Sequence, residues 1–274
     1  MLYKLVLLHQ HTPDHLSNTQ PTVSVIMPCY NSAGTIAQSI SSVLDQTFGS
    51  IELIVLDDGS TDNTVQIARR FAAEDTRLRL VCSARNRGVT RMRNIGTRLA
   101  KGKWIAFCDS DDTWLPQKLE WQLQLAGERK GVNLLYSAVY YTRERNPEAR
   151  QLVKLIPDAT YNDMLKTNAI PMSSSMYLTE SLGKLFFRPV PSHLVHEDYA
   201  FWLDVFKSGR VLSAYCEKPT TIILLRKGSR SSNALLAARS HLAILMNEKN
   251  LPWHKILRYM IIYMTIATRK RLPF

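Results

Sequence analysis

A regular alternation of apolar strands with helices constrains this chain more than any other feature. Between residues 23 and 130, four segments rich in β-branched and apolar residues are each followed by a segment with apolar residues at helical spacing. Strands that are apolar on both faces and alternate with helices are typical of a parallel sheet with right-handed crossovers. The expected strands are residues 23–30, 51–58, 78–84 and 103–109, and the expected helices are residues 33–47, 61–75, 90–100 and 116–130.

Polar and charged residues stand where three of these strands end. Ligands of open α/β sheets bind outside the carboxyl ends of the strands, so we expect these side chains to share one crevice. The carboxylates of Asp109, Asp111 and Asp112 repel each other at this spacing, and they need either bulk water or a cation. The polar strand ends are residues 28–31, 57–60 and 109–112, and the arginine-rich segment 85–94 follows the third strand.

Each of these segments also has a purely structural explanation. Asp57 and Asp58 fit a turn with a helix cap, Arg91 fits a solvated helix face, and residues 196–198 fit an exposed helix start. Their joint occurrence at one sheet edge favours a nucleotide site instead, with acids for the base, the ribose and a metal and arginines for phosphate. The sequence contains neither a Gly-x-Gly-x-x-Gly motif nor a Walker loop, which speaks against NAD and P-loop chemistry.

The net charge of +12 is concentrated at the C-terminal end. Residues 226–274 contain ten lysines and arginines and a single acid, Glu248, which predicts an anionic partner. This segment also carries apolar residues at helical spacing, so it predicts a helix that lies on an anionic membrane surface or packs on the main domain. These apolar residues are Trp253, Ile256, Leu257, Met260, Ile261 and Met264.

The start of the chain and the run lengths suggest a cytoplasmic protein. The first residues hold only a short apolar run, so we expect no signal peptide, and no uncharged apolar run approaches the ~20 residues of a spanning helix. The predicted organisation is a leader at residues 1–20, one α/β domain at 21–225 and a basic, helical tail at 226–274.

Several ordered motifs resemble the bacterial family 2 glycosyltransferases, which are nucleotide-sugar enzymes with the GT-A fold. The resemblance extends from about Pro21 to Phe206, and a weaker one, in residues 226–245, is to enzymes that build lipopolysaccharide and capsule. Met92 and Cys108 depart from the pattern without removing a reactive group. The motifs are "VSVIMPCYNSAGTIAQSISSVLDQT", "ELIVLDDGSTDNT", "RNRGVTRMRNIGTRLAKGKWIAFCDSDD" and "HEDYAFWL".

The resemblance implies a role for each matching position. Asp58 is expected to accept hydrogen bonds from the uracil or ribose, and Asp198 to act as the catalytic base. Arg91 falls in the segment that contacts nucleotide or phosphate, where Arg87 and Arg93 compete with it. Residues 109–111 match the Asp-x-Asp motif, in which Asp111 is implied to ligate Mg²⁺ or Mn²⁺ and Asp109 to face the ribose. Pro28, Tyr30 and Asn31 are implied to line the nucleoside pocket.

These roles predict an inverting hexosyltransferase that uses a nucleotide sugar, with UDP-hexose as the expected donor. The expected acceptor is a hydroxyl of a bacterial surface glycan or glycolipid, and no nucleic acid is expected to bind. One alternative is a nucleotidyltransferase of similar fold, although residues 28–35 lack the basic residue of its usual loop. The other is a nucleic-acid-binding protein that uses the basic tail, which gives the acidic crevice no role.

Overall fold

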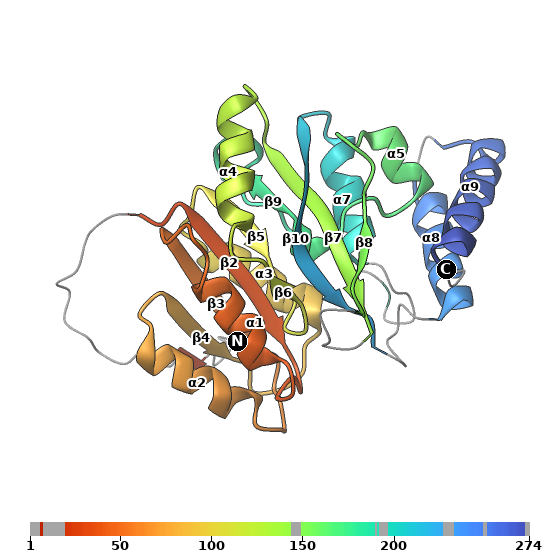
Figure 1. Cartoon of the computed structure of the whole chain (residues 1–274). Coiled ribbons are helices and arrows are strands. Elements are labelled where there is room, and N and C mark those ends of the chain that lie inside the picture. Colours follow the sequence, from red (N-terminus) through yellow and green to blue (C-terminus); the bar gives the residue numbers. More distant parts are fainter. Residues whose placement is uncertain are drawn as a thin grey trace.

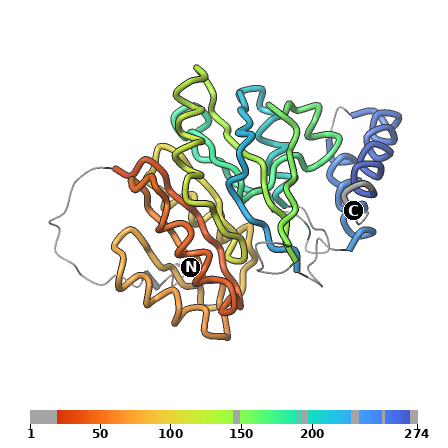
Figure 2. The backbone as a smooth tube through the Cα atoms, in the orientation of Figure 1, coloured from red at the N-terminus to blue at the C-terminus, as the bar shows by residue number. Residues whose placement is uncertain are grey.

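The computed structural model of this chain describes most of its 274 residues in one α/β architecture (Figure 1). Figure 2 shows the first half of the chain, red to yellow, on one side of the molecule and the second half, green to blue, on the other. The described residues are 6–7, 20–143, 149–189, 191, 197–226, 233–248 and 251–271, with the backbone alone for 6–7 and 269–271.

The first half contains the parallel sheet that the sequence predicts. Strand β2 (Val23–Cys29) lies between β3 (Ile51–Asp57) and β5 (Trp104–Phe107), and β3 pairs with β4 (Leu78–Cys82); all three pairings are parallel. Every residue of β2, β3 and β5 is buried, which explains why these strands read as continuous apolar runs. The helices between them are α1 (Ile36–Leu44), α2 (Thr64–Glu74) and α3 (Val89–Leu99).

Helices cover both faces of this sheet because alternate strand residues point to opposite sides. Val25 and Met27 face a core that α1, α2 and α4 (Lys118–Glu128) complete, whereas Ile26 faces a core that α3 completes. The second core also receives α5 (Tyr161–Lys166), α7 (Glu197–Lys207) and α8 (Ala234–Met246). The alternation of apolar residues in β2 therefore fixes which helices lie on which side.

The second half of the sheet is mixed, whereas the sequence predicted a mainly parallel, Rossmann-like sheet. Strand β9 (Met176–Leu178) pairs antiparallel with both β5 and β7 (Leu134–Thr142), and β10 (Ser213–Leu224) runs parallel to β7. The short strands β6 (Thr113–Trp114) and β8 (Gln151–Val153) pair antiparallel with β10 and β7. A turn of 3₁₀ helix, η2 (Met172–Ser174), precedes β9, and α6 (Thr179–Leu182) follows it.

The N-terminal end adds a strand to this sheet, and the C-terminal end adds two helices to the fold. Val6 and Leu7 form β1 (Val6–Leu7), which pairs antiparallel with β4, although the sequence analysis expected only a loose leader; the rest of residues 1–19 lies outside the described part. At the other end, α8 and α9 (Trp253–Arg271) lie side by side, far from α2 (Figure 1). No helix in the described ranges combines the length and apolar character needed to cross a bilayer.

Helix α4 carries a buried lysine that contacts η2. The ammonium group of Lys118 donates to the Gln122 Oε1 at 3.0 Å and to the Ser174 carbonyl at 2.8 Å, and it lies 4.9 Å from the Trp114 ring centroid. No carboxylate contacts this ammonium group among the described residues. Burial lowers the pKa of Lys118 to about 7, because the charged form is disfavoured away from water.

This lowered pKa predicts a pH-dependent stability. Above pH 7 the folded chain releases the Lys118 proton while the unfolded chain keeps it up to its ordinary pKa of 10.5, so the free energy of unfolding rises with pH in that window. The slope from one proton is at most about 1.4 kcal/mol per pH unit. Urea denaturation from pH 6.5 to 8.5 should show the wild type gaining stability relative to Lys118→Met. Parallel curves for the two proteins would contradict the shift.

Candidate active site

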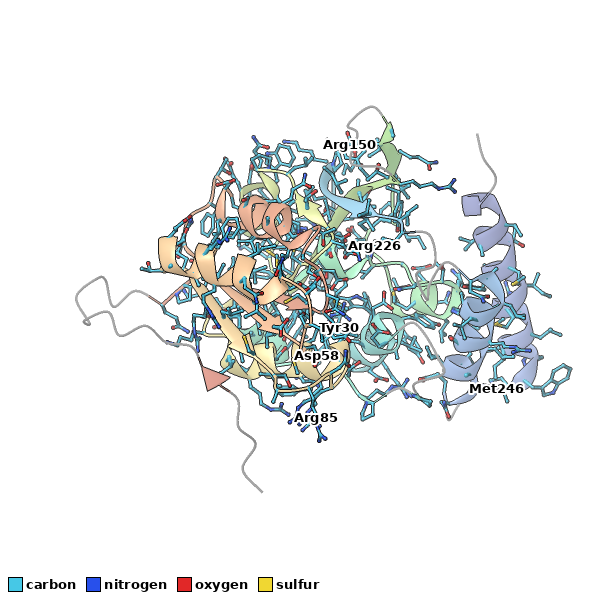
Figure 3. The ribbon with its side chains drawn as sticks, turned by 90° about the horizontal axis from the view of Figure 1, so that it is seen from below. Tyr30, Asp58, Arg85, Arg150, Arg226 and Met246 are labelled. Atoms are coloured by element: carbon cyan, nitrogen blue, oxygen red, sulfur yellow. The ribbon has the colours of Figure 1, made fainter. Side chains whose placement is uncertain are left out.

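The segments after β2 and β3 build one wall of the candidate site. The Asp58 amide donates to the Cys29 carbonyl at 2.9 Å, so Asp58 lies beside Tyr30, whose side chain is 47% exposed (Figure 3). Asn31 links the two segments, because its Oδ1 accepts from the Thr61 amide at 2.8 Å. Pro28 is buried in β2 just before this wall. The four positions that the sequence assigned to the nucleoside therefore gather at the carboxyl ends of two neighbouring parallel strands.

The two aspartates after β3 have different partners. The Asp57 Oδ2 accepts from the amides of Gly59 and Ser60, both at 3.1 Å, so Asp57 closes a turn, as its structural explanation predicted. The Asp58 carboxylate accepts from the amides of Arg87 and Gly88, both at 2.7 Å, and so holds the segment after β4 against this turn. Burial raises the pKa of Asp58, although the two amide hydrogen bonds act to lower it.

The close approach of the segment after β4 also explains the glycine at position 59 of this turn. Gly59 has a φ of +76°, and a Cβ there would lie 2.7 Å from the Arg85 carbonyl carbon, closer than packing allows. A larger residue at position 59 would separate the two segments that Asp58 joins.

Each of the three carboxylates after β5 has its own partner. Asp109 pairs with the buried Arg93 at 2.7 Å, and Asp111 pairs with Arg226 at 3.1 Å. The buried Asp112 accepts from the Ser173 hydroxyl at 2.5 Å and from the Leu224 amide at 3.2 Å. The pKa of Asp112 is raised well above its ordinary value, chiefly by burial and further by the negative charges of Asp111 and Asp109.

Arg93 joins this segment to α7. Its guanidinium group lies 2.7 Å from the Asp109 Oδ1 and 3.4 Å from the Glu197 Oε1, and it stacks 5.4 Å from the centroid of the Phe187 ring. Burial alone would lower the pKa of Arg93, but the charges of Asp109 and Glu197 outweigh it and raise the pKa above its ordinary value. The Arg93 side chain is therefore a charged link between the end of β5 and the first residue of α7.

Asp198 lies in the first turn of α7, where a helix dipole favours a carboxylate. The helix begins at Glu197 as the sequence predicts, and Phe201, Trp202 and Val205 are buried as its expected apolar face. The Asp198 Oδ2 accepts from the Asn168 Nδ2 at 2.8 Å, and the Asp198 side chain remains partly exposed. This carboxylate therefore keeps contact with solvent while a side-chain amide orients it.

The structure distinguishes the three competing arginines. Arg93 is buried and bridges two acids, Arg87 holds Asp58 through its backbone amide, and Arg91 is exposed on the first turn of α3. Two partners were missed from the sequence. Arg226 was counted only as tail charge, and Asn168 lies in a loop after α5 that carries no motif.

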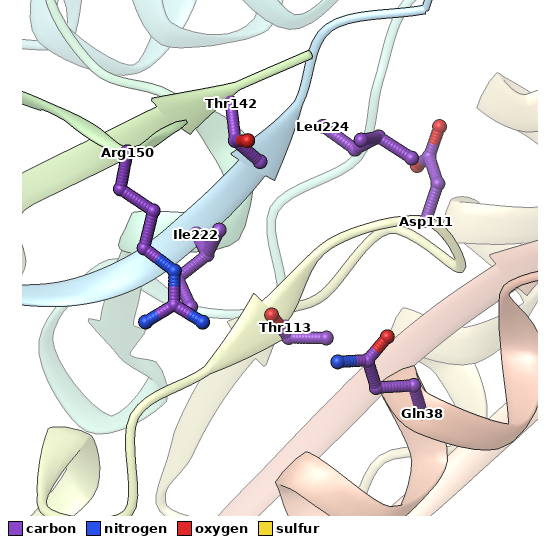
Figure 4. A pocket seen from close by; sticks show the side chains of 7 residues that line it. All are labelled: Gln38, Asp111, Thr113, Thr142, Arg150, Ile222 and Leu224. Carbon is purple, nitrogen blue, oxygen red and sulfur yellow. The ribbon is translucent and has the colours of Figure 1, made fainter. Parts of the chain in front are cut away.

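A hollow beside Asp111 is lined on its other side by an arginine (Figure 4). Arg150 lies across this hollow from Asp111, while Leu224 adjoins the aspartate. The hollow is lined by Gln38, Asp111, Thr113, Thr142, Arg150, Ile222 and Leu224.

The donor set beside this hollow fits a divalent cation held mainly by its substrate. The described residues contain no group of three or more His, Cys, Asp and Glu side chains arranged as a metal site. Asp111 nevertheless presents a partly exposed carboxylate whose oxygen already contacts a cationic group, Arg226. One such carboxylate suits Mg²⁺ or Mn²⁺, which bind through one or two carboxylates plus phosphate oxygens.

Sequence comparisons identify relatives of this chain. The family model described as "Glycosyl transferase family 2" matches residues 24–186. A UDP-Glc:alpha-D-GlcNAc-diphosphoundecaprenol beta-1,3-glucosyltransferase of Escherichia coli, WfgD, is 33% identical over 249 residues, which cover 90% of this chain and 94% of the relative. A putative teichuronic acid biosynthesis glycosyltransferase of Bacillus subtilis, TuaG, is 31% identical over 94% of this chain and 100% of the relative.

Solved structures share the fold. The structure of residues 1–349 of TarS from S. aureus in complex with UDP-GlcNAc superposes with a TM-score of 0.67 at 21% identity, covering 89% of this chain and 71% of that one. A mannosyltransferase from Pyrobaculum calidifontis, in complex with GDP-Man and Mn²⁺, gives a TM-score of 0.61 at 18% identity over 96% and 80% of the two chains. The likeness confirms the fold expected from the sequence motifs.

The contacts of Asp58 and Asp111 predict a larger loss of stability for Asp58→Ala than for Asp111→Ala. Asp58→Ala leaves the amides of Arg87 and Gly88 without their acceptor and should lower the free energy of unfolding by about 1–3 kcal/mol. Asp111→Ala removes a more exposed ion pair and should cost less than about 1 kcal/mol. Urea denaturation of both variants measures the difference, and equal stabilities would show that Asp58 does not hold the segment after β4.

Proposed function

The chain belongs to glycosyltransferase family 2, and from that premise we propose that it transfers a hexose, with inversion, from a UDP-sugar to a hydroxyl of a lipid-linked bacterial surface glycan. The observation that carries the proposal is the bridge through Arg93. It brings Glu197, and with it the adjacent Asp198, to the strand end that carries the Asp-x-Asp segment. A donor site and a base are thereby at one edge of the sheet, as a single displacement requires.

The donor is proposed to bind along the carboxyl ends of β2, β3 and β5. Pro28, Tyr30, Asn31 and Asp58 would form the nucleoside side, and the exposed Tyr30 ring offers a surface on which uracil could stack. Arg91, exposed at the start of α3, would meet phosphate or nucleotide. TarS, of the same fold, was solved with UDP-GlcNAc, which supports a uridine nucleotide.

Asp111 is the proposed ligand of Mg²⁺ or Mn²⁺, and Asp109 is proposed to face the ribose. The cation would neutralise charge on the departing diphosphate. The Pyrobaculum mannosyltransferase, with GDP-Man and Mn²⁺, supports a divalent cation in this fold. Asp109 keeps its bond to Arg93 in this arrangement, so the arginine orients its carboxylate.

Asp198 is the proposed catalytic base. Its carboxylate would take the proton of the acceptor hydroxyl while that oxygen attacks the anomeric carbon from the side opposite the diphosphate. Asn168 and the Tyr199 amide would hold the carboxylate in place, since they donate to its Oδ2 and Oδ1, both at 2.8 Å, and the partly exposed carboxylate has further lone pairs for the acceptor hydroxyl. A general base must lie within hydrogen-bond reach of the proton that it takes.

Asp198→Asn should reduce transfer roughly 10²–10⁴-fold, because the amide cannot take a proton. Its size and one of the two hydrogen bonds that Asp198 accepts, from Asn168 and from the Tyr199 amide, are retained, so UDP affinity should stay near the wild-type value and the melting temperature should fall only slightly. Product formation from UDP-hexose donors measures the rate, and calorimetry measures the affinity.

Glu197→Gln is the matched control, since Glu197 precedes Asp198 on the helix but pairs with Arg93. This variant should lower transfer less than Asp198→Asn and should lower the melting temperature more. A near-normal transfer rate in Asp198→Asn would show that Asp198 is not the catalytic base.

A surface on α8 and α9 supports contact with the membrane that would carry a lipid-linked acceptor. WfgD, by its name, acts on a diphosphoundecaprenol-linked sugar. Ile256, Tyr259 and Met260 pack α9 against the core, and other large apolar side chains of the two helices point to solvent. We define this apolar surface by its exposed residues Leu235, Leu242, Met246, Trp253, Leu257, Ile261 and Met264.

Charge accompanies the apolar surface. Trp253 and Met246 are 75% and 68% exposed, and Figure 3 shows Met246 on the helix pair, far from Tyr30 and Asp58. Lys255 and Arg258 are exposed on the same helix as Trp253. An exposed apolar strip on a helix that also carries exposed basic residues is suited to the surface of an anionic bilayer. The proposed arrangement is residues 21–225 as the catalytic domain and 226–274 as a basic tail, on a protein peripheral to the inner face of the cytoplasmic membrane.

Replacing Trp253, Leu257 and Ile261 by serine should abolish sedimentation with vesicles that contain phosphatidylglycerol. Lys255→Gln with Arg258→Gln should weaken binding at low salt only, since charge attraction is screened at high salt. Leu152→Ser is the matched control, because Leu152 is 46% exposed on β8, outside the apolar surface. If the wild-type protein does not sediment with anionic vesicles, the apolar surface does not bind a membrane.

A further inference from the structure

The two aspartates of the Asp-x-Asp segment have arginine partners of different kinds. The Arg93 side chain is 4% exposed and lies 2.7 Å from Asp109, whose own side chain is 32% exposed, so the arginine of this pair is shielded from water. The side chains of Arg226 and Asp111 are 41% and 31% exposed, and their closest atoms are 3.1 Å apart. An arginine in contact with solvent exchanges one anionic partner for another at little cost, whereas a buried arginine must keep its partner. Asp111 is therefore the aspartate whose partner can change.

Arg226 is fixed at its base and extended over the site. The Leu225 amide donates to the Thr142 carbonyl at 2.7 Å, and the Leu224 amide donates to Asp112, so the backbone just before Arg226 is held. Its guanidinium group contacts Asp111 through Nε and the Thr35 hydroxyl through Nη2 at 3.2 Å. The side chain thus spans from the segment after β5 to the residue before α1, and it can move without a change in the sheet.

We propose that Arg226 is an exchangeable counterion of Asp111 that moves to the donor's diphosphate when Asp111 binds a divalent cation. This inference rests on the proposed metal role of Asp111. A guanidinium group has five donors in a planar fork and binds phosphate oxygens in the same way as carboxylate oxygens. Without donor it neutralises Asp111, and with donor it neutralises the diphosphate that the cation brings to Asp111.

An exchangeable Arg226 and an Arg226 with a fixed structural role predict different effects on metal and nucleotide binding. In the absence of nucleotide, Arg226 and the cation compete for one carboxylate, so the arginine weakens metal binding. In the presence of UDP, Arg226 has a new anionic partner, so it strengthens nucleotide binding. Removing the guanidinium group should therefore change the two affinities in opposite directions.

The experiment is titration with Mn²⁺, followed by electron paramagnetic resonance, and titration with UDP at saturating Mn²⁺, followed by calorimetry. Arg226→Gln should bind Mn²⁺ about two- to fivefold more tightly than the wild type without nucleotide, the range expected for loss of an exposed ion pair. The same variant should bind UDP about tenfold more weakly or worse, as for a lost charge-assisted hydrogen bond. Its affinity for uridine, which has no phosphate, should not change.

Arg150→Gln is the matched control for charge. Arg150 lines the same hollow but lies across it from Asp111 (Figure 4), so its loss removes one positive charge without removing the ion pair. This variant should stay within about twofold of the wild type in both titrations, because a separated charge acts only through screened attraction. Equal effects of the two variants, or unchanged UDP affinity in Arg226→Gln, would overturn the exchange.

Asp111→Ala separates failure of this inference from failure of the proposed metal site. If Asp111→Ala loses Mn²⁺ binding while Arg226→Gln behaves like the wild type, the metal site stands and the exchange is wrong. If Asp111→Ala still binds Mn²⁺ with wild-type affinity, the metal ligand is another residue, and the exchange falls with the assignment on which it rests.

Discussion

The mutual repulsion of the carboxylates after β5 is the constraint on which the rest of this site depends. Three aspartates within four positions cannot be held near a sheet edge unless each is compensated separately. Arg93 comes from α3, Arg226 from the end of β10, and the hydroxyl and amide for Asp112 come from η2 and β10. The segment therefore draws distant parts of the chain to one point, and most of them belong to the second half of the molecule.

This compensation also connects the two halves of the fold. The proposed nucleoside side is built from the parallel strands of the first half, and Asp198, the proposed base, stands on α7 in the second. Arg93 connects the two, because it lies on α3 and contacts both Asp109 and Glu197. The desolvation of its guanidinium group has a cost that is offset only while both acids remain beside it. A shift of α7 relative to β5 would separate Arg93 from one of these acids, so the position of α7 is coupled to the position of the segment after β5.

Sequence patterns predicted the first half well and the second half poorly, for physical reasons. Strands β2 to β5 alternate with helices and are buried on both faces, so their apolar pattern is local and can be recognised in the sequence. Strand β9 has three residues and β6 two, and their antiparallel pairing depends on contacts distant in sequence. The same difference holds at the site. Strand-end aspartates can be recognised from their place in the chain, but Asn168 and Arg226 are defined by side chains more than 20 positions away that only the fold brings near.

The C-terminal helix packs on the domain and also leaves an apolar strip exposed, so packing and the proposed membrane contact are compatible. Packing on the domain and contact with a membrane compete only if one helical face must do both. On α9, Tyr259 and Met260 pack inward, and the Tyr263 ring stacks on His241 of α8 at 4.1 Å between centroids. Trp253, Leu257 and Ile261, four residues apart, form a neighbouring strip that remains exposed. A helix fixed by one strip can present the other at a constant orientation to the sheet. An acceptor held in a lipid surface would then meet the active site at a defined height, which a loosely tethered tail could not provide.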